Sequence, residues 1–215
     1  MGFRRGFAVP IIIGINVFVF LRWNLADGGA LEYMLENYTV IWDGLLAGRY
    51  WTLLTSVFSH NLLLHLLINM FVLNSFGTLL ERVLGTRRFV FFYLLAGAFS
   101  SLSHGLVSAF ILGRPDQPAV GASGAIAGLV LLFSLMFPRE KILVFGLIPL
   151  PALFGALAFV GLDIWGLVAQ AEGGGLPIGH GAHLGGALVG ALYYFLFIRK
   201  TWRRKSGLGR SGGIL

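Results

Sequence analysis

Three short polar motifs stand inside stretches that are otherwise apolar enough to cross a membrane. They are His65-Leu66-Leu67-Ile68-Asn69, Gly121-Ala122-Ser123-Gly124, and His183-Leu184-Gly185-Gly186 followed by Gly190. A serine that meets a histidine can act as a nucleophile whose proton the imidazole removes. A second histidine and an amide beside them can donate hydrogen bonds to a developing oxyanion. Because polar side chains at membrane depth are costly, they indicate a functional site by default.

Most of the chain is apolar and little of it is charged. Of its 215 residues, 57% are hydrophobic and 12% are charged, and the mean hydropathy is +0.83. This composition predicts a polytopic membrane protein. The chain has no cysteine, which excludes disulfides, thiolate metal sites and a cysteine nucleophile. We expect no metal ion and no cofactor.

Six apolar segments predict six transmembrane helices in a single all-α domain that covers residues 1–215. Each approaches the roughly 17–25 residues that a membrane-spanning helix needs. The fifth segment begins at Ile142 and is interrupted by Pro149 and Pro151, so we expect it to act as a moving gate. The other five segments cover 7–21, about 61–80, 89–112, 122–137 and 181–198, and short basic tails cover 1–6 and 199–215.

The segment 24–59 differs from a membrane span in composition. It mixes apolar and aromatic side chains with acidic ones, which is typical of helices that lie in the membrane interface. We therefore expect a long interfacial first outer loop with short helices. Arg4 and Arg5 before a short apolar run also resemble the start of a cleaved signal peptide. A retained first helix is favoured, because Arg22 and Trp23 suit its outer interface.

Basic residues gather on one side of the predicted membrane. The chain carries 16 Lys and Arg against 9 Asp and Glu, and all but Arg22, Arg49 and Arg114 lie in the tails or in two loops on the same side. The positive-inside rule therefore places both termini in the cytoplasm, which requires an even number of spans. Topology accounts for the net charge of +7. We expect no nucleic-acid binding, because no basic face alternates with stackable aromatic side chains.

Helix rise places the polar residues of three segments in one layer of the membrane. Counted at about 1.5 Å per residue from the cytoplasmic ends of their helices, Ser123 lies about 21 Å and His183 about 22 Å above that face. His65 lies about 22 Å and Asn69 about 17 Å above the same face. In a hydrophobic core about 30 Å thick, all four therefore lie several ångströms below the outer surface.

Glycines at helical spacing follow both the serine and the histidine. Gly124 and Gly128 are four residues apart, as are Gly186 and Gly190. Such small-xxx-small faces let two helix backbones approach closely. We expect the fourth and sixth helices to come near enough for the serine and the histidine to form a hydrogen bond. The alternative is that these glycines only pack helices.

The other polar residues also have ordinary structural explanations. A serine that opens a helix is often an N-cap. His65 and Asn69 share one helix face at i and i+4, and they could simply join two helices through hydrogen bonds. We expect His60, His104 and His180, near the outer side, to be structural or interfacial.

Together these motifs resemble those of the rhomboid intramembrane serine proteases over nearly the whole chain. Residues 121–128 resemble the family's Gly-x-Ser-Gly motif, and residues 182–190 resemble its His-x-x-Gly-x-x-x-Gly motif. Residues 65–69 resemble its His-x-x-x-Asn motif. Residues 53–60 and 77–89 resemble the pattern that flanks these motifs. The family's Trp-Arg pair in the first outer loop is replaced in 49–52. An aromatic that some members place four residues after the serine is Ala127 here, so the packing surface under His183 must come from elsewhere.

The resemblance implies a six-helix, bacterial-type rhomboid in the bacterial inner membrane, with both termini in the cytoplasm. It implies a serine-type endopeptidase that cuts peptide bonds in or near transmembrane segments, with Ser123 as nucleophile and His183 as base. The backbone N–H of Ser123, the Asn69 amide and His65 hold the oxyanion next to Gly121. The implied partners are transmembrane-helix proteins as substrates and the lipid bilayer.

A Ser–His dyad is expected, as in the family. Counted from Ile142, Asp163 lies about 31 Å up, near the outer interface, and is therefore not expected to join the pair. One alternative is a catalytically silent rhomboid-like protein that binds membrane segments, although such relatives lack the serine or the histidine. Another is a small transporter or channel, which needs ionisable residues along a path that the inner halves of these helices do not supply.

Overall fold

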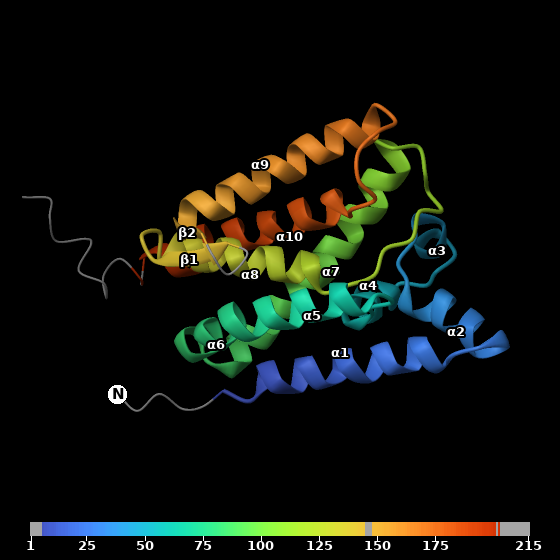
Figure 1. Ribbon diagram of the computed structural model, residues 1–215, viewed down its shortest axis with the longest axis horizontal. Coiled ribbons are helices and arrows are strands. Elements are labelled where there is room, and N and C mark those ends of the chain that lie inside the picture. The colour runs from blue at the N-terminus through green and yellow to red at the C-terminus, as the bar shows by residue number, and fades with distance from the viewer. Residues whose placement is uncertain (1–5, 145–147, 201, 203–215) are drawn as a thin grey trace, which may run out of the picture.

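The computed structural model describes residues 6–144, 148–200 and 202, and these form a largely helical molecule (Figure 1). The first part contains α1 (Ala8–Leu25), α2 (Gly28–Tyr38), α3 (Trp42–Leu46), α4 (Thr52–Thr55), the 3₁₀ turn η1 (Ser56–Phe58), α5 (Leu63–Val72), the π-helical turn η2 (Leu73–Gly77), α6 (Thr78–Leu84) and α7 (Thr86–Phe110). The second part contains α8 (Ser123–Met136), β1 (Lys141–Val144), β2 (Ile148–Pro151), α9 (Ala152–Ala171), α10 (His180–Tyr193) and the π-helical turn η3 (Tyr194–Ile198).

Each of the six apolar segments contributes a helix, which confirms the expected polytopic helical bundle. Five helical stretches of the described chain are long and apolar enough to cross a membrane. They are Ala8–Leu25, Leu63–Leu84, Thr86–Phe110, Ala152–Ala171 and His180–Ile198. The sixth, α8, is apolar but has only 14 residues, so it is about 21 Å long. Its short length leaves its first residue, Ser123, below the level that the longer helices reach.

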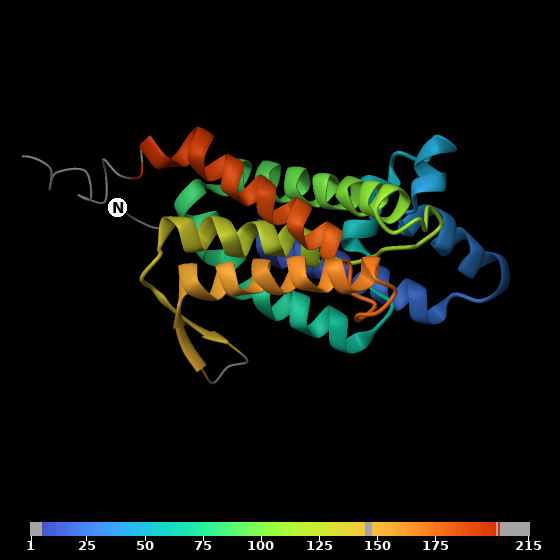
Figure 2. The same ribbon diagram turned by 90° about the horizontal axis from the view of Figure 1, so that it is seen from above.

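Helix α8 lies at the centre of the bundle. It packs against α5, α7, α9 and α10, and eleven of its 14 residues are buried. Helix α1 lies along the outer side of α5, η2 and α6, while α2 and α3 lie near the C-terminal end of α1 (Figures 1 and 2). The start of α1 and the end of η3 lie at the same end of the molecule, as an even number of spans requires (Figure 1).

The first outer loop contains short helices, as its composition predicted, and its backbone holds the segment that leads into α8. Val40 and Ala119 form an isolated antiparallel bridge with N···O distances of 3.0 Å in both directions. The Gly121 N–H donates to the Ser56 carbonyl across 2.9 Å. The residues just before Ser123 are therefore fixed from the loop side by three backbone hydrogen bonds.

The fifth segment differs from the prediction of a proline-interrupted helix. Lys141–Val144 and Ile148–Pro151 pair as antiparallel strands, and α9 begins only at Ala152 and continues unbroken to Ala171. Both prolines lie in β2, outside the helix, because proline lacks the N–H that a helix interior uses. The expectation that they interrupt the helix is therefore wrong, whereas the expectation that this segment acts as a gate stays a prediction.

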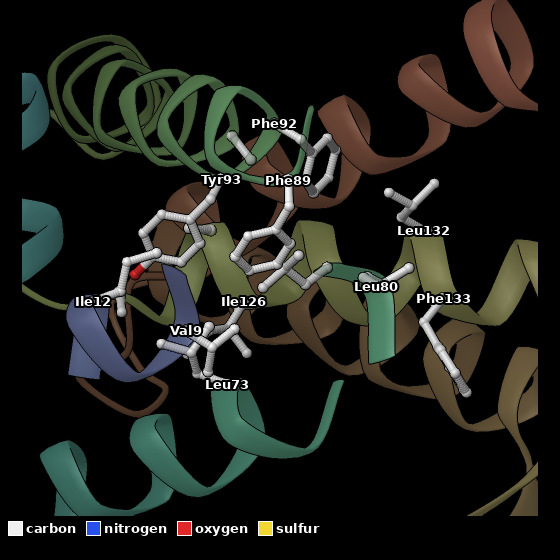
Figure 3. Close-up of a cluster of buried hydrophobic side chains, with 14 of the residues drawn as sticks. Val9, Ile12, Leu73, Leu80, Phe89, Phe92, Tyr93, Ile126, Leu132 and Phe133 are labelled. Atoms are coloured by element: carbon white, nitrogen blue, oxygen red, sulfur yellow. The ribbon is translucent and has the colours of Figure 1, made fainter. Parts of the chain in front are cut away.

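The largest buried cluster fills the space between α1, η2, α6, α7 and α8 (Figure 3). Its fully buried side chains include Val9, Leu73, Leu80, Phe89 and Leu132. Lipid is as apolar as these side chains, so their contribution comes from close packing more than from removal of water. Many large apolar side chains on the outer faces remain exposed, as expected for surfaces that face lipid.

A buried carboxylate fixes the first helix to the rest of the bundle. Glu81, 2% exposed, accepts hydrogen bonds from the backbone N–H groups of Ala8 and Val9 at 3.0 and 3.1 Å. It also accepts one from the Thr86 hydroxyl at 2.8 Å. Free N–H groups at a helix N-terminus favour an anion, so Glu81 caps α1 and ties it to the α6–α7 junction.

The two glycine pairs bring α8 and α10 into backbone contact, as their spacing predicted. A Cβ atom on Gly186 would overlap the carbonyl of Gly124, and one on Gly190 would overlap the carbonyl of Gly128. A Cβ on Gly128 would lie 2.7 Å from the Gly186 carbonyl oxygen. The side that Gly124 presents is filled by the Ser100 hydroxyl. No larger residue fits at Gly128, Gly186 or Gly190 without separating the two helices.

We expect Gly186→Ala to destabilise the protein strongly, because the new methyl meets backbone rather than a movable side chain. Overpacking typically costs about 1–3 kcal/mol, and a backbone obstacle places this site at the upper end. Thermal unfolding in detergent measures the effect. Gly161→Ala on α9 is the matched control, because a Cβ there has no atom within 4 Å. Equal melting temperatures for both variants would contradict the close approach.

Candidate active site

Ser123 and His183 meet at the ends of α8 and α10. Ser123 is the first residue of α8, and its Oγ lies 3.0 Å from His183 Nε2. The N-cap position belongs to Ala122, and no side chain caps this helix. The alternative explanation of Ser123 as an ordinary N-cap therefore does not hold. The glycine contacts between α8 and α10 place the two side chains at this distance.

A third residue joins the pair, contrary to the expectation of a dyad. Asp163 Oδ1 lies 3.0 Å from His183 Nδ1, and the Asp163 side chain is 5% exposed. The sequence estimate counted helix rise from Ile142, but the residues before Ala152 form a hairpin and add no rise. Counted from Ala152, Asp163 lies about 16 Å along α9, close to the level of Ser123. Asp163 is the only charged residue of α9, which is the signal that pointed to it.

His180 shares the same carboxylate oxygen. Its Nδ1 lies 2.7 Å from Asp163 Oδ1, and its side chain is 8% exposed. A Cβ atom on Gly166 would overlap the His180 ring, so this glycine makes room for the imidazole on α9. His180 is therefore a buried structural partner of Asp163 rather than a residue at the membrane interface. Its position three residues before His183, on the same helix face, could have indicated this.

The packing surface under His183 comes from α9. The Phe159 ring lies 5.6 Å from the His183 ring, centroid to centroid, with an angle of 32° between the planes. Phe159 stands four residues before Asp163, so one face of α9 both packs against the imidazole and binds its Nδ1. This contact replaces the aromatic that Ala127 does not supply.

Gly121 and His65 lie side by side next to the serine. Gly121 has a φ of +124°, which favours glycine, and a Cβ there would lie 2.6 Å from His65 Cε1. The His65 ring in turn contacts the His60 ring at 4.9 Å in an edge-to-face arrangement. The absence of a side chain at Gly121 therefore lets an imidazole approach the backbone just before Ser123.

Asn69 lies on the buried face of α5, with 4% exposure. Its Nδ2 donates to the carbonyl of His65 across 2.8 Å, within its own helix. One of its two amide hydrogens is therefore used locally, and the other is not needed for that bond. The structure brings His65 against Gly121 but gives Asn69 only this helical partner among the described residues.

The remaining two histidines have structural partners, as expected. His60 is fully buried, and its Nε2 accepts a long hydrogen bond of 3.4 Å from the Ala122 N–H. Burial, with a smaller effect from nearby His65, lowers the pKa of His60 to about 3, so the ring is neutral and can accept. His104 Nε2 lies 3.1 Å from the Gln117 carbonyl oxygen, in the segment before α8.

A packed bundle of apolar helices that encloses a hydrogen-bonded serine, histidine and aspartate defines a multi-pass membrane protein with a polar site inside the bundle. The Rhomboid domain family model matches residues 47–200, and the chain belongs to the rhomboid family. The matched range contains Ser123, His183 and Asp163, together with His65 and Asn69.

Curated relatives give the same family. Rhomboid protein 1, mitochondrial, of Saccharomyces cerevisiae is 36% identical over 190 residues, covering 86% of this chain and 51% of the yeast protein. RHOMBOID-like protein 12, mitochondrial, of Arabidopsis thaliana is 31% identical over 198 residues, covering 85% and 56%. The presenilin-associated rhomboid-like protein, mitochondrial, of Homo sapiens is 30% identical over 201 residues, covering 92% and 50%. The chain spans about half the length of these relatives.

These relatives contradict one expectation. The bacterial inner membrane, with both termini in the cytoplasm, was inferred from charge asymmetry and from the bacterial-type resemblance, whereas the relatives are mitochondrial proteins. Charge asymmetry distinguishes the two sides of a membrane, but it carries no information about which membrane that is. The multi-pass membrane assignment fits both the relatives and the helices.

Proposed function

We propose that this protein is a serine endopeptidase that hydrolyses peptide bonds in or near the transmembrane segments of other membrane proteins. The observation that carries the proposal is the hydrogen-bonded chain from Ser123 through His183 to Asp163, with distances of 3.0 Å at both links. Nucleophile, base and orienting acid within hydrogen-bond reach of one another are the arrangement that acyl-transfer enzymes need.

The proton transfers follow from the two nitrogens of His183. A proton on Nδ1, donated to Asp163, leaves the lone pair of Nε2 directed at the serine hydroxyl. As Ser123 Oγ attacks the substrate carbonyl, Nε2 takes its proton and later gives it to the departing amine. Asp163 then faces a positive imidazolium and stabilises it. Water, activated by His183 in turn, hydrolyses the acyl-enzyme and restores the serine.

The negative charge that develops on the substrate carbonyl needs donors near Ser123. The N-terminus of α8 supplies a free backbone N–H at Ser123 and a favourable helix dipole. The His65 imidazole, held against Gly121, and the second amide hydrogen of Asn69 are the side-chain donors that we assign to the oxyanion. This assignment rests on the motif, on burial and on the contact with Gly121.

A rhomboid that only binds membrane segments is the second candidate. Binding alone does not require the arrangement seen here, in which the Ser123 hydroxyl faces one nitrogen of His183 and the Asp163 carboxylate binds the other. A channel or transporter is disfavoured further, because the charged group inside α9 is paired within the site rather than placed along a path.

Labelling with a fluorophosphonate probe tests whether the serine is activated. We expect the purified protein to be labelled at Ser123, because only a serine beside a working base reacts readily with such probes. Mass spectrometry of the labelled peptide identifies the residue. Labelling of any other serine, or none while a known serine hydrolase in the same detergent is labelled, would contradict the proposal.

We expect Asn69→Ala to lower the single-turnover cleavage rate of a transmembrane substrate by about 10–10³-fold with little change in substrate affinity. The reason is that an oxyanion donor acts on the transition state and not on the bound substrate. His65→Ala should have a similar or larger effect. Rate and thermal stability are measured on the same sample.

A purely structural Asn69 gives a different result. Its loss would then cost about 0.6 kcal/mol of stability and leave the rate of the folded enzyme unchanged. Ser75→Ala on η2 is a matched control, because Ser75 donates to the Phe71 carbonyl within its own helix in the same way. A destabilised Asn69→Ala protein with a normal rate would reject the oxyanion role.

A further inference from the structure

We propose that Asp163, His180 and His183 form a binding site for Zn²⁺, and that Zn²⁺ bound there inhibits the enzyme reversibly. The inhibition rests on the proposed function, whereas the binding does not. The carboxylate comes from α9 and the two imidazoles come from the first turn of α10 (Figure 2 shows these helices side by side).

The three groups already lie at near-coordinating distances. Asp163 Oδ1 is 2.7 Å from His180 Nδ1 and 3.0 Å from His183 Nδ1, and all three ligand atoms lie within 4.8 Å of one another. Around a tetrahedral zinc with bonds of about 2.0–2.1 Å, ligand atoms are separated by about 3.3 Å. The distances between the three ligand atoms, from 2.7 Å to at most 4.8 Å, bracket that separation. Small rotations of the side chains therefore bring the three atoms onto one ion.

The cluster is also held in place before any ion arrives. Asp163 and His180 are 4% and 7% exposed, and Gly166 leaves the space in which the His180 ring lies. His180 and His183 are one turn apart on the same helix face, a spacing that places both imidazoles on one side of α10. Because the ligands are rigid, binding costs little side-chain entropy.

The donor set selects the class of cation. Two imidazole nitrogens and one carboxylate oxygen suit zinc and neighbouring transition metals, whereas Mg²⁺ and Ca²⁺ prefer oxygen ligands alone. Three protein ligands leave the fourth position of a zinc tetrahedron to water. In the α9–α10 connection next to the site, residues 172–178 are exposed, which gives an ion access from that end of the bundle.

Inhibition follows from the protonation of His183. A neutral imidazole carries one proton, and coordination through Nδ1 forces that proton onto Nε2. Nε2 faces the Ser123 hydroxyl at 3.0 Å. Protonated, it becomes a donor and cannot remove the serine proton. Zn²⁺ also occupies the carboxylate that would stabilise the imidazolium, so one ion disables both the base and its partner.

The test compares His180→Asn with the wild type. The Nδ2 of asparagine can replace the His180 Nδ1–H in the hydrogen bond to Asp163, but an amide nitrogen does not bind zinc. We expect micromolar to submillimolar Zn²⁺ to inhibit wild-type cleavage, EDTA to restore it, and Mg²⁺ to have no effect. In His180→Asn, the concentration for half inhibition should rise at least about tenfold, because loss of even an outer-shell partner of a metal ligand typically costs about 10–100-fold in affinity. His104→Gln, altered at a buried histidine outside the cluster, should keep wild-type sensitivity.

Binding is measured separately on the inactive Ser123→Ala protein, with Co²⁺ as a spectroscopic substitute for zinc. We expect the visible absorption of tetrahedral Co²⁺ in Ser123→Ala, its displacement by Zn²⁺, and its loss in Ser123→Ala/His180→Asn. Co²⁺ binding without any proteolysis in the wild type would support the site and reject the enzymatic proposal. Absence of Co²⁺ binding, or equal zinc sensitivity in wild type and His180→Asn, would overturn the site.

Discussion

Ser123→Ala and His183→Ala are each expected to abolish cleavage of a transmembrane substrate while leaving the fold intact. The Oγ–Nε2 hydrogen bond of 3.0 Å joins two groups that work only together, so either loss removes nucleophilic attack. In a serine protease of soluble type, loss of the nucleophile or the base lowers kcat by about 10⁶-fold, and this scale applies here. Cleavage is measured in liposomes that contain enzyme and substrate.

The double variant separates catalysis from general damage. Ser123→Ala/His183→Ala should be no slower than either single variant, because the pair acts as a unit. Ser134→Ala on α8 is the matched control: Ser134 is buried on the same helix, and its hydroxyl has no hydrogen-bond partner among the described residues. It should cleave at the wild-type rate. Turnover near that rate in either active-site variant would reject the proposed site.

The meeting of Ser123 and His183 could be predicted because it depends on local periodicity. Helix rise fixes the height of a residue once one end of its helix is known, and the glycine spacing of four identifies the face on which two helices touch. Both arguments need only the residues of α8 and α10. The contacts of Gly186 and Gly190 with the opposite backbone agree with this prediction.

The place of Asp163 could not be predicted in the same way, because its height depended on where α9 begins. The apolar residues from Ile142 onward continue the hydropathy of the helix, so composition alone does not separate strand from helix there. Pro149 and Pro151 could have indicated that α9 begins after them, since proline favours strand edges and helix starts over helix interiors. Phe159 was missed for the same reason, because its height is tied to that of Asp163.

The residues that the first outer loop contacts could not be predicted from the sequence either. Composition correctly indicated short helices in 24–59, but the bridge between Val40 and Ala119 joins residues nearly eighty positions apart. Such long-range pairing leaves no periodic pattern in either segment. It matters for the site, because this loop holds the backbone that leads to Ser123.

Asp163→Asn is expected to lower kcat by about 10²–10⁴-fold with KM nearly unchanged, the scale seen when the acid of a Ser–His–Asp site is neutralised. The amide can donate its Nδ2–H to His183 Nδ1, which moves the imidazole proton to Nε2 and turns the base into a donor toward Ser123. It also removes the negative charge that faces the imidazolium. Single-turnover cleavage and the rate of fluorophosphonate labelling should fall together.

Two comparisons distinguish this catalytic loss from other effects of the substitution. His180→Asn leaves the carboxylate in place and preserves a donor to it, so it should retain most of the wild-type rate. Asp163→Asn/His183→Ala should be no slower than His183→Ala, because the carboxylate acts only through the histidine. A dyad mechanism, the expectation from the family resemblance, predicts instead that Asp163→Asn changes stability and leaves the rate of the folded enzyme close to wild type. Since Asp163 Oδ1 is the hydrogen-bond partner of His183 Nδ1 in the structure, we expect Asp163→Asn to lower the cleavage rate rather than the melting temperature.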